Sequence, residues 1–130
     1  MILIIGHPNA GKTTFSARFE HVLHLDDFPP NKFLNCNQAV AESGGDVVVD
    51  GIYNLRCRRL RLLEGCRGNS PKVCYLLDTP LDECIRREEQ GRQRPGVMEH
   101  SYLEPPTLDE GWDEIRIIRD GNEEIIVAPS

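Results

Sequence analysis

Short, continuous runs of apolar residues recur along the chain, separated by longer stretches in which apolar and charged residues mix. The runs are rich in leucine and β-branched residues, and they do not alternate with polar positions. This pattern is typical of parallel strands that are covered on both faces. We therefore expect buried strands at residues 2–5, 22–25, 47–49 and 73–77.

The mixed stretches between these runs predict helices at about residues 12–20, 32–43, 55–65 and 80–90. The last helix has clear signals at both ends: Thr79 is a suitable N-cap, Pro80 suits the first helical position, and Gly91 can end the helix. Strands that alternate with helices predict an α/β fold of three layers, in which helices flank a mostly parallel, five-stranded sheet.

Two further apolar segments, residues 115–118 and 124–127, are separated by Asp120 and Gly121. They predict either a hairpin or a fifth strand followed by a tail. A length of 130 residues is typical of one domain, so we expect a single domain over residues 1–130.

A phosphate-binding motif connects the first predicted strand to the first predicted helix. Residues 6–13 read GHPNAGKT and match the pattern GxxxxGK[ST], in the strand–loop–helix context that this pattern requires. Its glycines let backbone N–H groups surround phosphate oxygens, and the helix N-terminus favours the anion. The motif predicts the loop of P-loop nucleotide-binding proteins. We expect ATP to bind through Gly6, His7, Pro8, Asn9, Ala10, Gly11, Lys12, Thr13 and Thr14.

Three side chains of this loop have specific expected roles. Lys12 should reach the β- and γ-phosphates, Thr13 should bind Mg²⁺ through its hydroxyl, and Thr14 should contact the α-phosphate. We assign no chemistry to His7, whose expected role is to fill the loop.

Carboxylates follow two of the predicted strands, at the edge of an open α/β sheet where ligands bind. Asp26 and Asp27 follow the second strand, and Asp50 follows the third. Phosphate transfer to a hydroxyl needs one carboxylate to accept the proton and another to hold Mg²⁺ or its waters. We assign Asp50 to the metal and Asp26 to the proton, with Asp27 as the alternative base. Helix capping is the alternative role for Asp26 and Asp50.

Arginines gather in two clusters. Arg86, Arg87, Arg92 and Arg94 lie at the end of the fourth helix and just beyond it. We interpret residues 86–96 as a lid whose arginines neutralise a transferring phosphate, with a solvated helix face as the alternative. The second cluster spreads around the third helix, which favours a solvated face over contact with a phosphate-bearing acceptor. Its members are Arg56, Arg58, Arg59 and Arg61.

Composition and charge limit the partners and the cell compartment that we expect for this chain. The net charge of −6 weighs against a large nucleic-acid footprint. Five cysteines without a CxxC pair predict free thiols in a reducing compartment. No apolar run approaches the roughly 20 residues that cross a bilayer, and the apolar start is too short for a secretion signal. We expect a cytoplasmic protein, in the host cytoplasm for a viral chain, with no membrane partner.

Over nearly its full length the chain resembles P-loop kinases of the polynucleotide 5′-hydroxyl kinase type. The sequence LDDF at residues 25–28 resembles the family's Asp-Asp-aromatic element, whose first aspartate, here Asp26, is the base. DGIYN at residues 50–54 resembles its Asp-x-Thr-Asn stretch, with Tyr53 in place of threonine. Residues 76–92 resemble its strand, helix and arginine lid, with Arg87 and Arg92 nearest the lid arginines. LEPPTLDEGW at residues 103–112 is similar to a Glu-x-Pro-Thr-x-x-Glu-Gly-aromatic signature and is the most discriminating match.

The resemblance implies transfer of a phosphate from ATP, with Mg²⁺, to a hydroxyl on a nucleic acid or nucleotide-like acceptor. One departure is that the arginine expected after the Asp-Asp pair is absent, and Lys32 is the nearest cation. Hydroxymethylated pyrimidines in DNA, nucleosides and aminoacyl-tRNA therefore stay open as acceptors.

Two other classes of function are alternatives: a nucleotide-dependent switch or ATPase, and a non-catalytic nucleotide-binding module. A switch has no need of a base such as Asp26, and a module has little use for Lys12, Thr13, Asp26 and Asp50 together.

Overall fold

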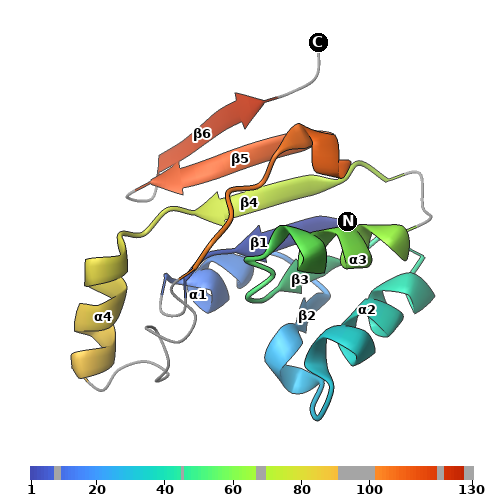
Figure 1. Cartoon of the computed structure of the whole chain (residues 1–130), viewed down its shortest axis with the longest axis horizontal. Helices are drawn as coiled ribbons and strands as arrows, with labels where there is room; N and C mark the ends of the chain where they lie inside the picture. Colours follow the sequence, from blue (N-terminus) through green and yellow to red (C-terminus); the bar gives the residue numbers. More distant parts are fainter. Residues whose placement is uncertain (8–9, 45, 67–69, 91–101, 120–121, 128–130) are drawn as a thin grey trace.

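The computed structural model of the chain forms a six-stranded sheet with helices on both sides (Figure 1). The structure describes residues 1–7, 10–44, 46–66, 70–90, 102–119 and 122–127, the last range for its backbone only. Within these ranges, no helix has the length and apolar character needed to cross a membrane.

The strands lie in the order β2-β3-β1-β4-β5-β6. Neighbours pair in parallel, except that β5 and β6 form an antiparallel hairpin. The predicted α/β fold with five parallel strands is confirmed, and the hairpin adds a sixth strand at one edge. The strands are β1 (Ile2–Ile5), β2 (Val22–His24), β3 (Val48–Asp50), β4 (Val73–Leu77), β5 (Glu114–Arg119) and β6 (Asn122–Val127).

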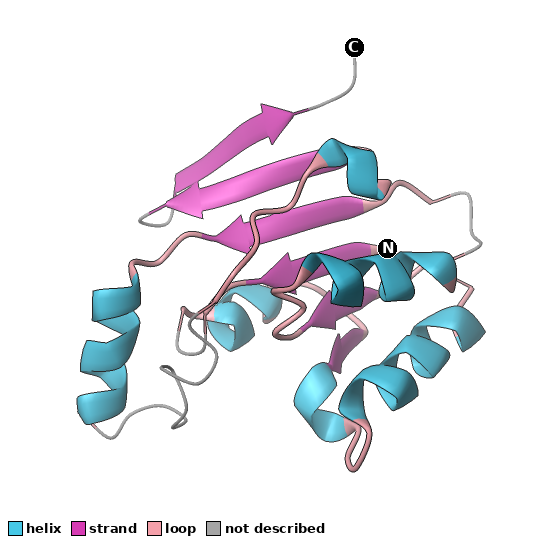
Figure 2. Ribbon diagram, viewed as in Figure 1, coloured by secondary structure: helices cyan, strands magenta, loops and turns pink. Residues whose placement is uncertain are grey.

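Apolar side chains on both faces of the sheet make the three layers. Leu3 and Ile5 of β1 join a cluster with α2 and α3, whereas Ile4 joins a cluster with α1 and α4. Figure 2 shows α3 in front of the sheet and α1 behind it. The helices are α1 (Lys12–Ser16), α2 (Lys32–Glu42), α3 (Arg56–Glu64) and α4 (Leu81–Glu89), with 3₁₀ turns η1 (Leu25–Asp27) and η2 (Leu108–Glu110).

The first helix is shorter than the predicted 12–20, because the chain tightens into turns after Ser16. The Arg18 N–H donates to the Phe15 carbonyl at 3.3 Å, and the Phe19 N–H donates to the Ser16 carbonyl at 3.0 Å. The Phe19 ring thereby reaches Tyr75 of β4, with 5.9 Å between ring centroids. Packing against the sheet therefore ends the helix early.

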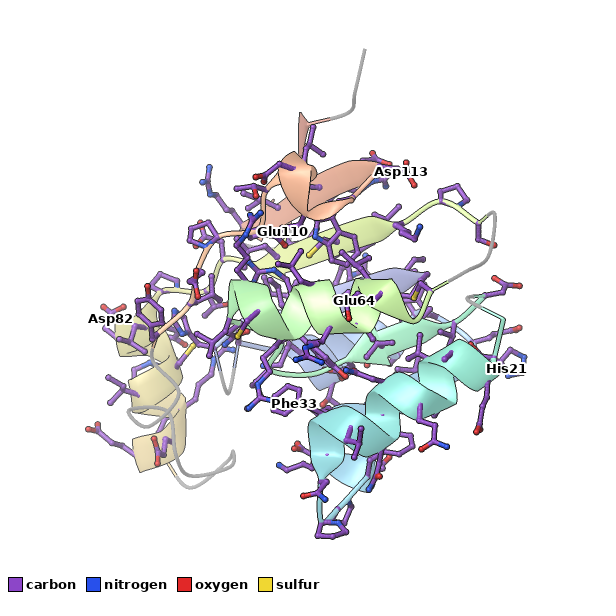
Figure 3. All side chains as sticks on the ribbon, turned by 45° about the vertical axis from the view of Figure 1, so that its right-hand side comes forward. His21, Phe33, Glu64, Asp82, Glu110 and Asp113 are labelled. Atoms are coloured by element: carbon purple, nitrogen blue, oxygen red, sulfur yellow. The ribbon has the colours of Figure 1, made fainter. Side chains whose placement is uncertain are left out.

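A buried ion pair fastens the segment at residues 103–112 to α3. Arg59 is fully buried and donates to both oxygens of Glu110, at 2.7 Å from Nε and 3.0 Å from Nη2. The indole of Trp112 and the backbone N–H of Thr107 also donate to Glu110, at 3.0 and 3.1 Å. Figure 3 labels Glu110 beside α3. The Glu-Gly-aromatic end of the signature is thus an anchor in the core, through Glu110 and Trp112.

The prediction of a solvated face for the second arginine cluster is wrong for Arg59. The segment at residues 103–112 covers that side of α3 and brings acidic residues onto it. Arg56 also pairs with this segment, through Asp109 at 3.1 Å. Arg58 lies over the ring of Phe33 in α2, 4.1 Å from the ring centroid.

Opposing effects set the pKa of Glu110. Burial alone would raise it, but the hydrogen bonds from Arg59 and Trp112 and the charge of Arg59 together lower it. The stability that the pair contributes is therefore complete above the ordinary pKa of a glutamate. It is lost as the pH falls through the lowered pKa.

We predict that Arg59→Met destabilises the protein by about 3–5 kcal/mol, because it leaves Glu110 as a buried charge without its partner. The matched control is Arg61→Met, on the exposed side of the same helix, which should change stability by less than about 0.5 kcal/mol. Urea unfolding followed by far-UV circular dichroism measures both. Equal unfolding midpoints for the two variants would contradict this role of the ion pair.

Candidate functional site

The candidate site lies at the carboxyl ends of the parallel strands, the edge toward which β1, β4 and β5 point in Figure 1. Loops that follow β1, β2, β3 and β4 meet there. They carry the GxxxxGK[ST] motif, the three strand-end carboxylates (Asp26, Asp27 and Asp50) and the start of α4. Ligands bind at this edge of open α/β sheets.

The lysine of the motif lies across its own loop. Lys12 Nζ donates to the carbonyl oxygens of Gly6 and His7, at 3.1 and 2.9 Å. Gly11 has a φ of 97°, a left-handed conformation that favours glycine, and it leads directly into α1. The ammonium group is therefore held at the mouth of the loop, where it can exchange carbonyl oxygens for phosphate oxygens.

Two side chains from neighbouring loops hold the phosphate-binding loop in place. Thr79, after β4, donates from its hydroxyl to the Ala10 carbonyl at 2.9 Å. Asn54, after β3, is buried and donates from its amide to the Gly6 carbonyl at 3.1 Å. The prediction of Thr79 as an N-cap is wrong, because Pro80 occupies that position and the Thr79 hydroxyl is used on the loop.

Arg87 comes from α4 to the rim of the same loop. A Cβ atom built at Gly11 would lie 4.0 Å from Arg87 Nη1. Its Nε donates to Glu83 Oε1, one turn earlier, at 3.2 Å. The hydrogen bond from Arg86, reinforced by Arg87, lowers the pKa of Glu83 to about 2. An ionised Glu83 thus holds Arg87 while one end of its guanidinium faces Gly11.

Asp50 is 5% exposed and lies against the first turns of α1. Its Oδ2 accepts a hydrogen bond from the Ser16 hydroxyl at 3.2 Å and lies 3.1 Å from His24 Nδ1. The Ser16 hydroxyl also lies 2.9 Å from the Thr13 carbonyl oxygen. Ser16 therefore links the carboxylate to the turn that carries Thr13.

Asp26 differs from Asp50 in its exposure. It lies in η1, its side chain is 43% exposed, and it pairs with Lys32 Nζ at 2.9 Å. Gly51 permits this placement, since a Cβ there would lie 2.5 Å from the Cβ of Leu25. Asp27 is also exposed. Asp26 is thus an accessible carboxylate with a cation beside it.

The fold brings several of the predicted residues together and leaves others undescribed. Lys12, Gly11 and Arg87 lie together at the loop. Asp50 is linked to the turn that carries Thr13 by way of the Ser16 hydroxyl. Thr14 is exposed on the first turn of α1, and Asp26 is on a separate element. Four residues predicted for the loop and the lid lie outside the described residues: Pro8, Asn9, Arg92 and Arg94.

Sequence reasoning missed four polar residues of this site. Asn54 lies in the DGIYN stretch, but nothing in its spacing pointed to the loop. His24 is a polar residue inside an otherwise apolar strand, which is a usable signal. Thr79 suited a cap equally well, and Ser16 resembled any polar helix residue.

The donor atoms near Thr13 and Asp50 fit a magnesium ion. Mg²⁺ prefers oxygen ligands, keeps several waters and takes further ligands from phosphates, so few protein oxygens suffice. The Thr13 hydroxyl, with the Asp50 carboxylate linked to the same turn through Ser16, fits this requirement. Among the described residues, no group of three or more His, Cys, Asp or Glu side chains could hold a metal ion.

The fold is similar to those of a sugar kinase and a gluconokinase of known structure, at low sequence identity. No family model matches the chain, and no curated protein matches its sequence. An unliganded sugar kinase from Janibacter sp. HTCC2649 has a TM-score of 0.65 and 15% identity, over 90% of this chain and 83% of that one. A gluconokinase from Sinorhizobium meliloti 1021 has a TM-score of 0.57 and 16% identity, over 90% and 80%.

Proposed function

We propose that this chain is an ATP-dependent kinase that transfers the γ-phosphate to a hydroxyl group. One observation carries the proposal. Lys12 and Arg87 lie together at the loop of the GxxxxGK[ST] motif, and the Ser16 hydroxyl links Asp50 to the turn that carries Thr13. The similarity in fold to small P-loop sugar kinases supports it.

The nucleotide end of the site performs binding and charge neutralisation. Loop N–H groups and Lys12 hold the β- and γ-phosphates, and Arg87 neutralises charge that spreads over the transferring group. Thr13 and Asp50 would hold Mg²⁺, which when bound shields and orients the phosphate oxygens. Asp50 and Arg87 are already oriented by hydrogen bonds, so their positions need little change during transfer.

The acceptor end of the site supplies the base. As the acceptor oxygen bonds to the γ-phosphorus, its proton passes to Asp26 and ADP leaves with the bridging oxygen. Lys32 Nζ lies 2.9 Å from Asp26 Oδ1, and this contact orients the carboxylate that would take the proton.

For the acceptor, we propose a nucleic acid or nucleotide-like hydroxyl. Phe33, at the start of α2, lies beside Lys32 in sequence and beneath the exposed cation of Arg58. The exposed guanidinium of Arg58 over this ring, with Lys32 next in sequence, suits an acceptor that carries a base and a phosphate. A sugar-like polyol is the second candidate, favoured by the fold similarity to sugar kinases.

Transfer of labelled γ-phosphate to a panel of acceptors tests the function. The panel contains 5′-hydroxyl DNA and RNA, hydroxymethyluracil DNA, nucleosides, tRNA, gluconate and simple sugars. Labelling of any hydroxyl supports the kinase and identifies its acceptor. Rapid ATP hydrolysis with no labelled acceptor would favour the switch or ATPase instead.

We predict that Asp26→Asn lowers the transfer rate by about 10²–10⁴-fold, because the hydroxyl loses its proton acceptor. Binding of ATP, measured by calorimetry, should not change. Asp27→Asn is the matched control, because it removes the same charge from the next residue in the chain. This variant should keep most of the activity. The reverse result, with Asp27 essential and Asp26 dispensable, would reassign the base.

We predict that Arg87→Met lowers kcat by at least about tenfold, with a smaller effect on KM, because its charge is needed most during transfer. Arg86→Met is the control, because Arg86 pairs with the same Glu83 but its side chain is 54% exposed. Steady-state kinetics separate the two parameters. Equal losses in both variants would mean that Arg87 acts only by stabilising α4.

A further inference from the structure

One row of side chains crosses three strands directly beneath the phosphate-binding loop. In the parallel register, Asp50 of β3 lies opposite Ile4 of β1 on one side and His24 of β2 on the other. Paired residues on neighbouring strands face the same side of a sheet. The register therefore places His24 beside the carboxylate of Asp50.

The contact between these two residues has a defined direction. His24 Nδ1 lies 3.1 Å from Asp50 Oδ2, and an ionised carboxylate can only accept a hydrogen bond. Nδ1 must therefore carry the proton that it donates. The His24 side chain is 38% exposed, whereas that of Asp50 is 6% exposed, so the histidine closes the solvent side of a buried carboxylate.

Both hydrogen bonds to this carboxylate fall on one oxygen. The single proton of the Ser16 hydroxyl is shared between the Thr13 carbonyl at 2.9 Å and Oδ2 at 3.2 Å, and His24 donates to the same Oδ2 from β2. Among the residues that the structure describes, Oδ1 of Asp50 accepts no hydrogen bond. His24 therefore supplies the unshared hydrogen bond that orients the carboxylate through Oδ2 and leaves Oδ1 for another partner.

We propose that His24 is a positioning residue for the magnesium ion of the bound nucleotide. With Ser16, it holds Oδ2 of Asp50 so that Oδ1 is available to the metal or to one of its waters. The inference rests on the proposed function only in placing a metal–nucleotide complex at the loop. Outer residues that orient a metal ligand typically contribute 10- to 100-fold to metal affinity.

The test compares two substitutions of His24. His24→Phe keeps an aromatic ring but removes the hydrogen-bond donor to Asp50. His24→Asn keeps a donor, because its amide N–H lies the same number of bonds from the backbone as Nδ1. Mn²⁺ affinity is measured by electron paramagnetic resonance with a saturating, non-hydrolysable ATP analogue. We expect about 10- to 100-fold weaker Mn²⁺ binding in His24→Phe and a loss of only a few-fold in His24→Asn.

Two controls separate positioning from general damage. Metal-free binding of the ATP analogue should be the same in wild type and in both variants, because His24 touches no part of the loop in the proposed role. Gln38→Ala, an exposed change on α2, should leave Mn²⁺ binding unaltered. If His24→Phe fails to fold, His24→Leu removes the same donor with a smaller apolar side chain and should weaken Mn²⁺ binding in the same way.

The outcomes distinguish this inference from the proposed function. Wild-type Mn²⁺ affinity in His24→Phe, or equal losses in His24→Phe and His24→Asn, would overturn the positioning role alone. If the wild type binds neither the ATP analogue nor Mn²⁺ with it, the proposed function fails, and the role of His24 fails with it.

Discussion

The parallel pairing of β1 with β3 is the constraint on which the rest of the site depends. Ile4 lies opposite Asp50, and the Gly51 N–H donates to the Ile4 carbonyl at 3.2 Å. Since β1 runs straight into the phosphate-binding loop, this register puts Asp50 beneath the first turns of α1. A slip of one residue would turn the carboxylate to the opposite face of the sheet, away from α1.

A second network fixes the other side of the loop. Asn54 donates to the Gly6 carbonyl, and its own backbone carbonyl accepts from the Glu104 N–H at 2.9 Å. Glu104 lies near the start of the segment at residues 103–112, which the buried Arg59–Glu110 pair holds on α3. A chain of hydrogen bonds therefore connects the loop at residues 6–13, through Asn54 and Glu104, to the segment held by the Arg59–Glu110 pair. This ion pair lies outside the loop but supports its geometry.

Local sequence predicted the strands, the loop between β1 and α1, and the carboxylates at strand ends, because these depend on short patterns and on the polarity of a parallel sheet. It missed what depends on tertiary contacts. Nothing near Arg59 in sequence shows that residues 103–112 will cover it, and spacing alone made its helix resemble a solvated face. The early end of α1 depends on Tyr75, which is far away in sequence. Thr79 suited a cap and a loop anchor equally, and only the position of Ala10 decides between them.

The central claim is that this edge of the sheet is built to hold a metal-bound triphosphate. A crystal structure with Mg²⁺ and a non-hydrolysable ATP analogue tests it most directly. The account predicts that Lys12 Nζ leaves the Gly6 and His7 carbonyls for the γ-phosphate. It also predicts that Thr13 binds the metal and that Asp50 lies next to it, directly or through a water. A nucleotide bound elsewhere, or a metal out of reach of both Thr13 and Asp50, would contradict it.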